Sequence, residues 1–275
     1  MAAADSPPTL ASALARLETR WGSAAVRLGS GRPVAHGSLA LAVQPEPADS
    51  PQPALTDAVS TGFADLDALL GPGGLPRAAS ASLRGGRSSG KTSLVLHCIA
   101  QAQAQGAIAA FLDLGHVFDP LEAASRGIDL RWLLVVRPAD PEEGFAIGVA
   151  LLGGRAVDLL VVDLPERLAA RHEAALRRLA AQARRTEARL VVLEPAALPQ
   201  ALHGALAESV GLRLELEHRA WLRLGRDVVG RRVGVNVAKN RFGPPGRQAE
   251  LEIRYLADGE QAPAVIGSAA VGLAA

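Results

Sequence analysis

The chain is 275 residues long, with 49% hydrophobic residues, 3% aromatic residues and a formal net charge of +1 at pH 7. This length allows one large domain with appendages, and its core must be built mainly from Ala, Leu and Val. The near-neutral charge excludes a basic footprint over the whole chain, so nucleic-acid binding has to be argued from a local site. The single cysteine, Cys98, excludes a disulfide framework. No apolar run reaches the roughly 20 residues that span a bilayer, and no signal peptide is predicted, so we expect a cytoplasmic protein without a membrane partner.

The N-terminal part predicts an arm and a linker. Residues 9–21 read as an amphipathic helix with Leu10, Leu14 and Leu17 on one stripe, and residues 24–28 as a short strand. Such an arm either docks on a neighbouring subunit or folds onto its own domain. We expect a docking arm (1–30), a Pro/Ala/Ser-rich mobile linker (31–54), an ATP-binding core (55–258) and a flexible tail (259–275).

A glycine-rich run follows an apolar strand predicted at residues 79–83 and precedes a mostly buried helix predicted at residues 93–100. The run fits the pattern G-x-x-x-x-G-K-[ST], in which backbone N–H groups and a lysine bind phosphates and a hydroxyl meets Mg²⁺. A chance Gly/Ser turn is the alternative, and both flanks argue against it. The predicted nucleotide-binding residues are Gly85, Gly86, Arg87, Ser88, Ser89, Gly90, Lys91, Thr92 and Ser93.

The core then alternates between strands and helices, which predicts an α/β fold with a mostly parallel sheet covered on both faces. After about residue 212 short alternating strands without long helices predict an antiparallel extension of that sheet. The expected strands are 107–113, 132–136, 157–163, 189–193, 212–216, 220–224, 232–237 and 249–255, and the expected helices are 141–152 and 165–186.

The strand at 157–163 is apolar and ends in a carboxylate, which is the pattern of a Walker B element. Asp163 would lie beside the phosphate loop and, with Thr92, orient Mg²⁺. Hydrolysis also needs a group that orients the attacking water, often a glutamate on an adjacent strand end. Residues 111–116 offer Asp113 and His116 but no glutamate, and His116 is either a substitute base or a structural histidine, so no catalytic residue is assigned.

A group of arginines in the second half of the chain has two interpretations. It forms either a basic patch or the solvated face of an amphipathic helix. The residues are Arg177, Arg178, Arg184, Arg185 and Arg189.

In the order of its motifs the chain resembles RecA, the bacterial recombinase, from about residue 10 to residue 255. The motifs include Ser60-Thr61-Gly62, the phosphate loop, Asp119-Pro120, the strand at 157–163, and Val237-Ala238-Lys239-Asn240-Arg241. The resemblance implies a RecA-like fold with ATP and Mg²⁺ as cofactors. It also implies that Asp119 contacts the base, that Lys239 and Arg241 reach a neighbouring subunit's ATP, and that the N-terminal arm docks on another subunit.

The departures from RecA concern DNA-coupled ATP turnover. RecA's catalytic glutamate falls at Gly115, its adenine-stacking tyrosine at Glu122, and its γ-phosphate-sensing glutamine at Glu194 or Pro195. The first DNA-binding loop is missing, because the helix expected over 166–186 follows Asp163 almost directly. The second is shortened to residues 194–205, which contain no Lys, Arg, Phe, Tyr or Trp to neutralise phosphates or stack on bases.

This combination resembles the RecA-like accessory proteins of the ImuA type. It implies a regulator of SOS damage tolerance that binds ATP weakly or structurally and contacts RecA or like subunits. Its other partners would be a polymerase homologue of the ImuB type and an error-prone polymerase, and single-stranded DNA would bind weakly or indirectly. The alternatives are a divergent but active DNA-dependent ATPase of recombination, with His116 or Asp113 in place of the glutamate, and a phosphate-loop kinase or NTPase unrelated to DNA.

Overall fold

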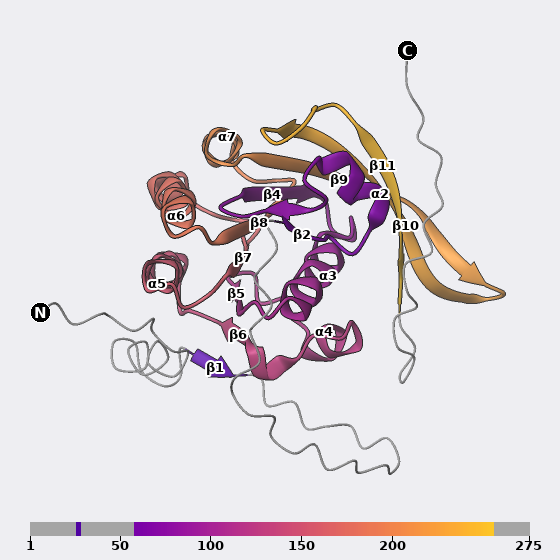
Figure 1. Cartoon of the computed structure of the whole chain (residues 1–275), viewed down its shortest axis with the longest axis horizontal. Helices are drawn as coiled ribbons and strands as arrows, with labels where there is room; N and C mark the ends of the chain where they lie inside the picture. Colours follow the sequence, from indigo (N-terminus) through magenta and orange to yellow (C-terminus); the bar gives the residue numbers. More distant parts are fainter. Residues whose placement is uncertain (1–25, 29–57, 256–275) are drawn as a thin grey trace, which may run out of the picture.

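The computed structural model describes residues 26–28 and 58–255. Across these residues one nine-stranded sheet has the order β1-β6-β5-β7-β8-β4-β9-β10-β11. Helices cover both faces of its central part (Figure 1). The predicted α/β fold, with a mostly parallel sheet extended by antiparallel strands, is confirmed.

The parallel part of the sheet contains six strands, five of which end at a common edge while the sixth, Leu212–Leu224, continues beyond it. Asp113 and Asp163 pair there side by side, although they are fifty positions apart in the sequence. Every residue of β5 and β7 is buried, which is expected where helices cover both faces of a sheet. The strands are β4 (Ser80–Gly85), β5 (Ala109–Asp113), β6 (Leu133–Val136), β7 (Leu159–Asp163), β8 (Arg189–Pro195) and β9 (Leu212–Leu224).

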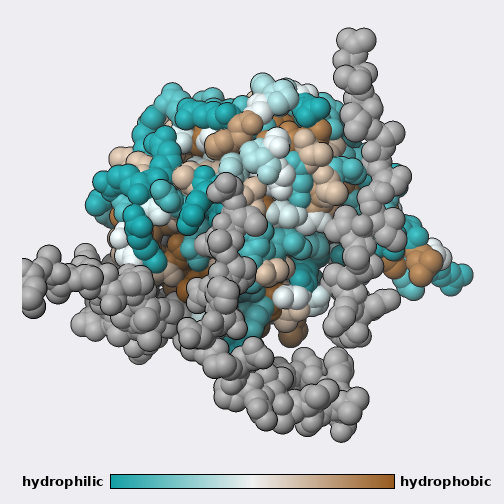
Figure 2. Space-filling view, in the orientation of Figure 1, coloured by the Kyte–Doolittle hydropathy of each residue, from teal (hydrophilic) through white to brown (hydrophobic). Residues whose placement is uncertain are grey.

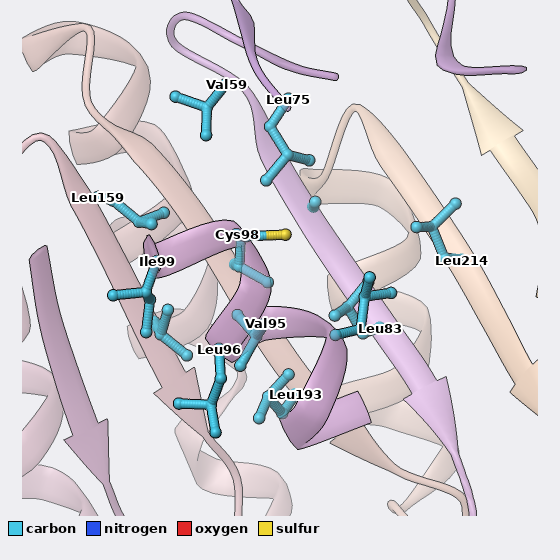
Figure 3. Packing of buried hydrophobic residues seen from close by; sticks show 14 of the residues in the cluster. Val59, Leu75, Leu83, Val95, Leu96, Cys98, Ile99, Leu159, Leu193 and Leu214 are labelled. Atoms are coloured by element: carbon cyan, nitrogen blue, oxygen red, sulfur yellow. The ribbon is translucent and has the colours of Figure 1, made fainter. Parts of the chain in front are cut away.

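Two apolar layers join the sheet to its helices. On one face α3 packs through Val95, Leu96 and Ile99 (Figure 3). On the other face Leu151 of α5 and Leu179 of α6 belong to a second core cluster. The helices are α2 (Ala64–Leu70), α3 (Lys91–Ala104), α4 (Pro120–Ser125), α5 (Pro141–Gly153), α6 (Glu173–Thr186) and α7 (Gln200–Ser209), with 3₁₀ turns η1 (Leu130–Trp132) and η2 (Ala170–His172). In the part of the chain that the structure describes, no helix is long and apolar enough to cross a membrane.

The antiparallel end of the sheet contains β9, β10 (Asp227–Asn240) and β11 (Gln248–Arg254). The separate strands expected at 212–216 and 220–224 are wrong, because both belong to the single strand β9. The pairing between β9 and β10 shifts between Arg232 and Val233, so a bulge interrupts the alternation without ending the strand. The far end of this hairpin projects from the body and carries exposed apolar side chains such as Leu224 (Figures 1 and 2). Apart from this sheet, β2 (Ala58–Val59) pairs with β3 (Leu75–Pro76).

The helix expected over residues 165–186 is too long at its N-terminal end. The segment after β7 crosses the sheet edge, where the Leu164 N–H donates to the Leu193 carbonyl at 3.1 Å. Leu164 and Leu168 are both buried in the core, although residues 164–169 form no helix. The regular helix α6 begins only at Glu173, so the connection is longer than predicted.

Two other expectations are corrected by burial. Arg189 does not belong to a solvated helix face, because it is buried on β8 and its Nε donates to the Leu75 carbonyl at 3.0 Å. The shortened loop expected at 194–205 ends in a helix, α7. Leu202, Ala205 and Leu206 bury one side of α7, and their spacing is helical.

The strand β1 (Val26–Leu28) lies at the other end of the sheet. It pairs antiparallel with β6 of the same chain, with Val26 opposite Val136 and Leu28 opposite Leu134. The predicted helix at 9–21, the linker at 31–54 and the tail at 259–275 lie outside the described residues. β1 therefore covers backbone groups of β6 that an edge strand would leave unpaired.

Candidate nucleotide-binding site

The phosphate-loop sequence connects the end of β4 to the start of α3. Gly90 has a φ of +90°, a conformation that L side chains rarely adopt, and a Cβ there would lie 2.9 Å from a methyl carbon of Val233. Ser88 also has a positive φ, of 59°. The loop therefore has the left-handed turns that direct successive N–H groups toward one concave side.

Lys91, the first residue of α3, folds back over this loop. Its Nζ donates to the carbonyl of Gly85 at 2.6 Å and to that of Gly86 at 2.9 Å. Burial lowers the pKa of Lys91, while the carboxylates of Asp163 and Glu166 act in the opposite direction. The ammonium group thus lies against the glycine turns, where a bound phosphate would be close to it.

A cleft of about 920 Å³ opens over the loop. All nine predicted nucleotide-binding residues, 85–93, contribute to its wall, and Asp163 lies in the same wall. Arg87 and Glu166 form an exposed ion pair at 2.6 Å between two segments of the wall. The other lining residues are Leu114, Gly115, Val117, Leu164, Pro165, Leu193, Pro195, Ala196, Ala197 and Arg231.

Asp163 is the carboxylate at the end of β7. Burial, together with the neighbouring charge of Asp113, raises the pKa of Asp163 to about 7, against the lowering effect of Lys91. A cation at this place would favour the ionised carboxylate. No cluster of three or more His, Cys, Asp and Glu side chains suited to a metal occurs in residues 58–255. The predicted Mg²⁺ ligands Thr92 and Asp163 both lie in the cleft wall, and phosphate and water would complete the coordination.

Gly115 faces this carboxylate across the cleft wall. A Cβ added to Gly115 would lie 2.3 Å from Oδ2 of Asp163, much closer than any real contact. The residue therefore provides no carboxylate, and the space for one is filled by Asp163.

The two candidates for a base, Asp113 and His116, both lie outside the cleft wall. Asp113 is fully buried and accepts hydrogen bonds from the Val117 and Phe118 N–H groups, and it pairs with Arg137 at 2.8 Å. His116 has a φ of +55° and, among the described residues, is not part of the cleft wall. A catalytic role for either residue remains a prediction.

Comparisons with known proteins identify the family. A model of the RecA N-terminal domain matches residues 49–194. RecA of Roseiflexus sp. (strain RS-1) is 35% identical over 72% of this chain and 64% of that protein. RecA of Leifsonia xyli subsp. xyli (strain CTCB07) is 33% identical over 92% of this chain and 73% of that protein. The chain belongs to the RecA family.

Two further facts describe this relationship. The chain spans 64% of the length of the Roseiflexus RecA, so it matches part of that protein. The crystal structure of the RadB recombinase superposes with a TM-score of 0.57 and 22% identity, covering 70% of this chain and 95% of the RadB chain. This likeness establishes the shared fold.

The other residues singled out by the resemblance to RecA lie away from the cleft. Asp119 caps α4, where its carboxylate accepts from two backbone N–H groups of the first turn. Lys239 donates to the carbonyl of Ala207, and Arg241 donates to that of Glu208. These two cations thus lie at the C-terminal end of α7, where positive charge is favourable.

Glu194 and Pro195, the two residues aligned with the γ-phosphate-sensing glutamine of RecA, lie in different environments. Pro195 lines the cleft, whereas Glu194 is fully buried beneath it. Oε1 of Glu194 lies 2.5 Å from Nδ1 of His203 and 3.5 Å from a guanidinium nitrogen of Arg213. Arg84 approaches the same oxygen at 3.6 Å. Glu194 therefore ties α7 to β8, β4 and β9.

Two charged residues of the cleft wall, Glu166 and Arg231, were not predicted from the sequence. Glu166 follows Asp163 by three positions, which is a usable signal, but the sequence around it predicts a helix. Arg231 lies far along the chain in an alternating strand and carries no local motif. Its position depends on the pairing of β10 with its neighbours.

Proposed function

We propose that this chain is an ATP-binding accessory protein of the RecA family that acts in bacterial SOS damage tolerance. It would work through contacts with RecA or a translesion polymerase complex of the ImuB type, and not as a recombinase. The observation that carries this proposal is the pair Gly115 and Asp163. The place of a catalytic glutamate has no side chain, and a neighbouring carboxylate fills the space.

ATP with Mg²⁺ is the ligand that the cleft fits best. RecA-family proteins bind ATP with Mg²⁺, and this chain keeps the elements needed for both parts of that ligand. Lys91 and the loop N–H groups would hold the phosphates, and Thr92 with Asp163 would hold the metal. Bound Mg²⁺ would neutralise phosphate charge, and Lys91 would leave the Gly85 and Gly86 carbonyls to contact the phosphates.

The segments that replace DNA-binding loops support a regulator. The connection after β7 is held to the core by Leu164 and Leu168. The connection after β8 leads into α7, which the buried Glu194, with His203, fixes to the sheet. A segment fixed in this way does not become ordered when DNA binds. DNA binding would therefore have little effect on ATP turnover at the nucleotide site.

The resemblance to RecA also suggests which surfaces contact a partner protein. Lys239 and Arg241 are positioned beside the end of α7, outside this chain's own cleft. We propose that this face contacts a RecA-like subunit, together with the N-terminal arm.

The test measures ATP turnover by the purified chain, with and without single-stranded DNA, using Lys91→Ala as the blank. We expect binding of Mg²⁺–ATP but turnover equal to the blank in both conditions. Pull-down with purified RecA, the polymerase homologue and the error-prone polymerase then tests the partners. DNA strand exchange by the purified chain, or failure to bind any of these proteins, would contradict the proposal.

A second candidate is a divergent DNA-dependent ATPase, and one observation favours it. Glu166 places a carboxylate in the cleft wall, where it pairs with Arg87. That carboxylate could orient water in place of the glutamate missing at Gly115. DNA-stimulated turnover that is lost in Glu166→Gln would make this candidate the leading one.

A further inference from the structure

We infer that Arg231 positions the phosphate loop and transmits its occupation to the β9–β10 hairpin. This inference rests on the proposed binding of a nucleoside triphosphate. The main observation is a hydrogen bond between distant parts of the chain: Nη1 of Arg231 donates to the Ser88 carbonyl at 2.8 Å. Arg231 is thereby the hairpin residue that holds the tip of the phosphate loop.

The guanidinium of Arg231 itself contacts two aromatic rings. Its Nε donates to the Tyr255 hydroxyl at 2.8 Å. Its Cζ lies 5.2 Å from the centre of the Tyr255 ring and 5.5 Å from that of Trp221. These distances are typical of cation–π contacts, so the planar group has few alternative positions. The side chain of Arg231 is thus restrained in the orientation in which it contacts the phosphate loop.

Ser88, the loop residue that Arg231 contacts, has an unusual backbone conformation. Ser88 has a φ of 59°, which is uncommon for a residue other than glycine. A charged hydrogen bond to its carbonyl stabilises this peptide orientation and with it the direction of the neighbouring N–H groups. Arg231 therefore favours a loop that is already shaped for phosphate.

The same contacts connect loop and hairpin. If a bound triphosphate moves Ser88, either the bond to Arg231 breaks or the guanidinium shifts across the Trp221 ring. Trp221 is 43% exposed and pairs directly with Arg231 in the sheet. Its fluorescence should therefore report occupation of the loop.

Arg232 provides a matched control. It is adjacent in the sequence and has the same charge, but it pairs with Glu250 at 2.9 Å and Glu252 at 2.8 Å on β11. Among the described residues, it is not part of the cleft wall. Arg232→Gln should leave nucleotide binding unchanged.

The experiment uses the full chain with Trp21→Phe and Trp132→Phe, so that Trp221 is the only tryptophan. Calorimetry measures the affinity for Mg²⁺ with a non-hydrolysable ATP analogue, and fluorescence follows Trp221. We expect Arg231→Gln to weaken binding about tenfold and abolish the fluorescence change, because a hydrogen bond from a charged group is lost. Arg231→Lys should recover part of the affinity, and Tyr255→Phe should weaken binding about threefold while keeping the ring.

Each outcome is decisive. If the parent binds the analogue and Arg231→Gln equals Arg232→Gln in affinity and fluorescence, the inference is overturned while nucleotide binding stands. If the parent binds no nucleotide by calorimetry, both the inference and the proposed cofactor are overturned. Should Arg231→Gln fail to fold, the same comparison is made with Arg231→Lys and Tyr255→Phe, and unchanged values in both overturn the inference.

Discussion

Oδ2 of Asp163 lies 2.3 Å from the place where a Cβ on Gly115 would be. The backbone of Gly115 is not in the left-handed region, so its conformation would accept a side chain. The steric obstacle to a side chain at this position is the carboxylate of Asp163. The observed position of the Asp163 carboxylate therefore depends on the absence of a side chain at Gly115. A change at residue 115 acts first on the residue proposed to bind the metal.

Gly115→Ala should weaken the binding of Mg²⁺–nucleotide by roughly two- to tenfold, because Asp163 has to leave its rotamer at a cost of about 0.5–1.5 kcal/mol. Binding of the nucleotide in EDTA should not change. Calorimetry with and without Mg²⁺ checks both statements. Gly204→Ala on α7 is the control, since a Cβ there meets nothing within 4 Å.

Gly115→Glu should not restore ATP turnover by itself. The longer side chain meets the same oxygen, so the new carboxylate is gained while the carboxylate of Asp163 is displaced. Phosphate-release assays with single-stranded DNA measure the result against Lys91→Ala. Turnover above that blank would mean that Asp163 and a glutamate can be accommodated together.

Glu194→Ala should lower the free energy of unfolding by about 3 kcal/mol, because it removes the buried carboxylate beside Arg213 and leaves that guanidinium with the more exposed Glu215 at 3.8 Å. Amides of α7 should also exchange faster with solvent, since His203 loses its contact to Glu194 on β8 and keeps only the one to Arg213 on β9. Urea unfolding and hydrogen exchange measure these effects. In contrast, Glu208→Ala breaks an exposed pair with Arg177 and should cost less than about 1 kcal/mol.

The stability of the fold should fall on acidification through His97. Burial, with the nearby charge of Arg126, lowers the pKa of His97 from 6.5 to about 4. The unfolded chain therefore binds a proton between these values that the folded chain does not. Stability is complete above pH 6.5 and decreases toward pH 4, by roughly 2 kcal/mol between pH 7 and pH 5.

His97→Gln checks this assignment. Arg126 donates to Nε2 of His97 at 2.9 Å, and a glutamine oxygen can accept the same bond without titrating. The variant should have a smaller decrease of unfolding free energy between pH 7 and pH 5 than the wild type. Equal decreases would show that other groups cause the acid sensitivity.

Local patterns predicted the parts of the fold that depend on neighbouring residues. The run 85–92 and the apolar strand ending at Asp163 each carry their own signal, and parallel strands bring both to one edge of the sheet. The structure places 85–93 and Asp163 in one cleft wall, while their roles in binding remain predictions.

Long-range pairing explains what was missed. Arg231 reaches Ser88 only because β9, β10 and β11 lie in a particular register, which no short window of sequence specifies. The false helix start before Glu173 has a similar cause. Leu164 and Leu168 are apolar in a spacing compatible with a helix, but the sheet edge buries them in another conformation.

The pairing of β1 with β6 restricts how another chain can join this sheet. A strand from another chain can pair directly with β6 only by taking over hydrogen bonds that β1 already makes, so pairing with β6 is an exchange and not an addition. The number of backbone bonds stays nearly constant, and little free energy is gained from pairing alone. Assembly through β6 would then be limited by the departure of β1, a first-order step whose rate does not depend on protein concentration.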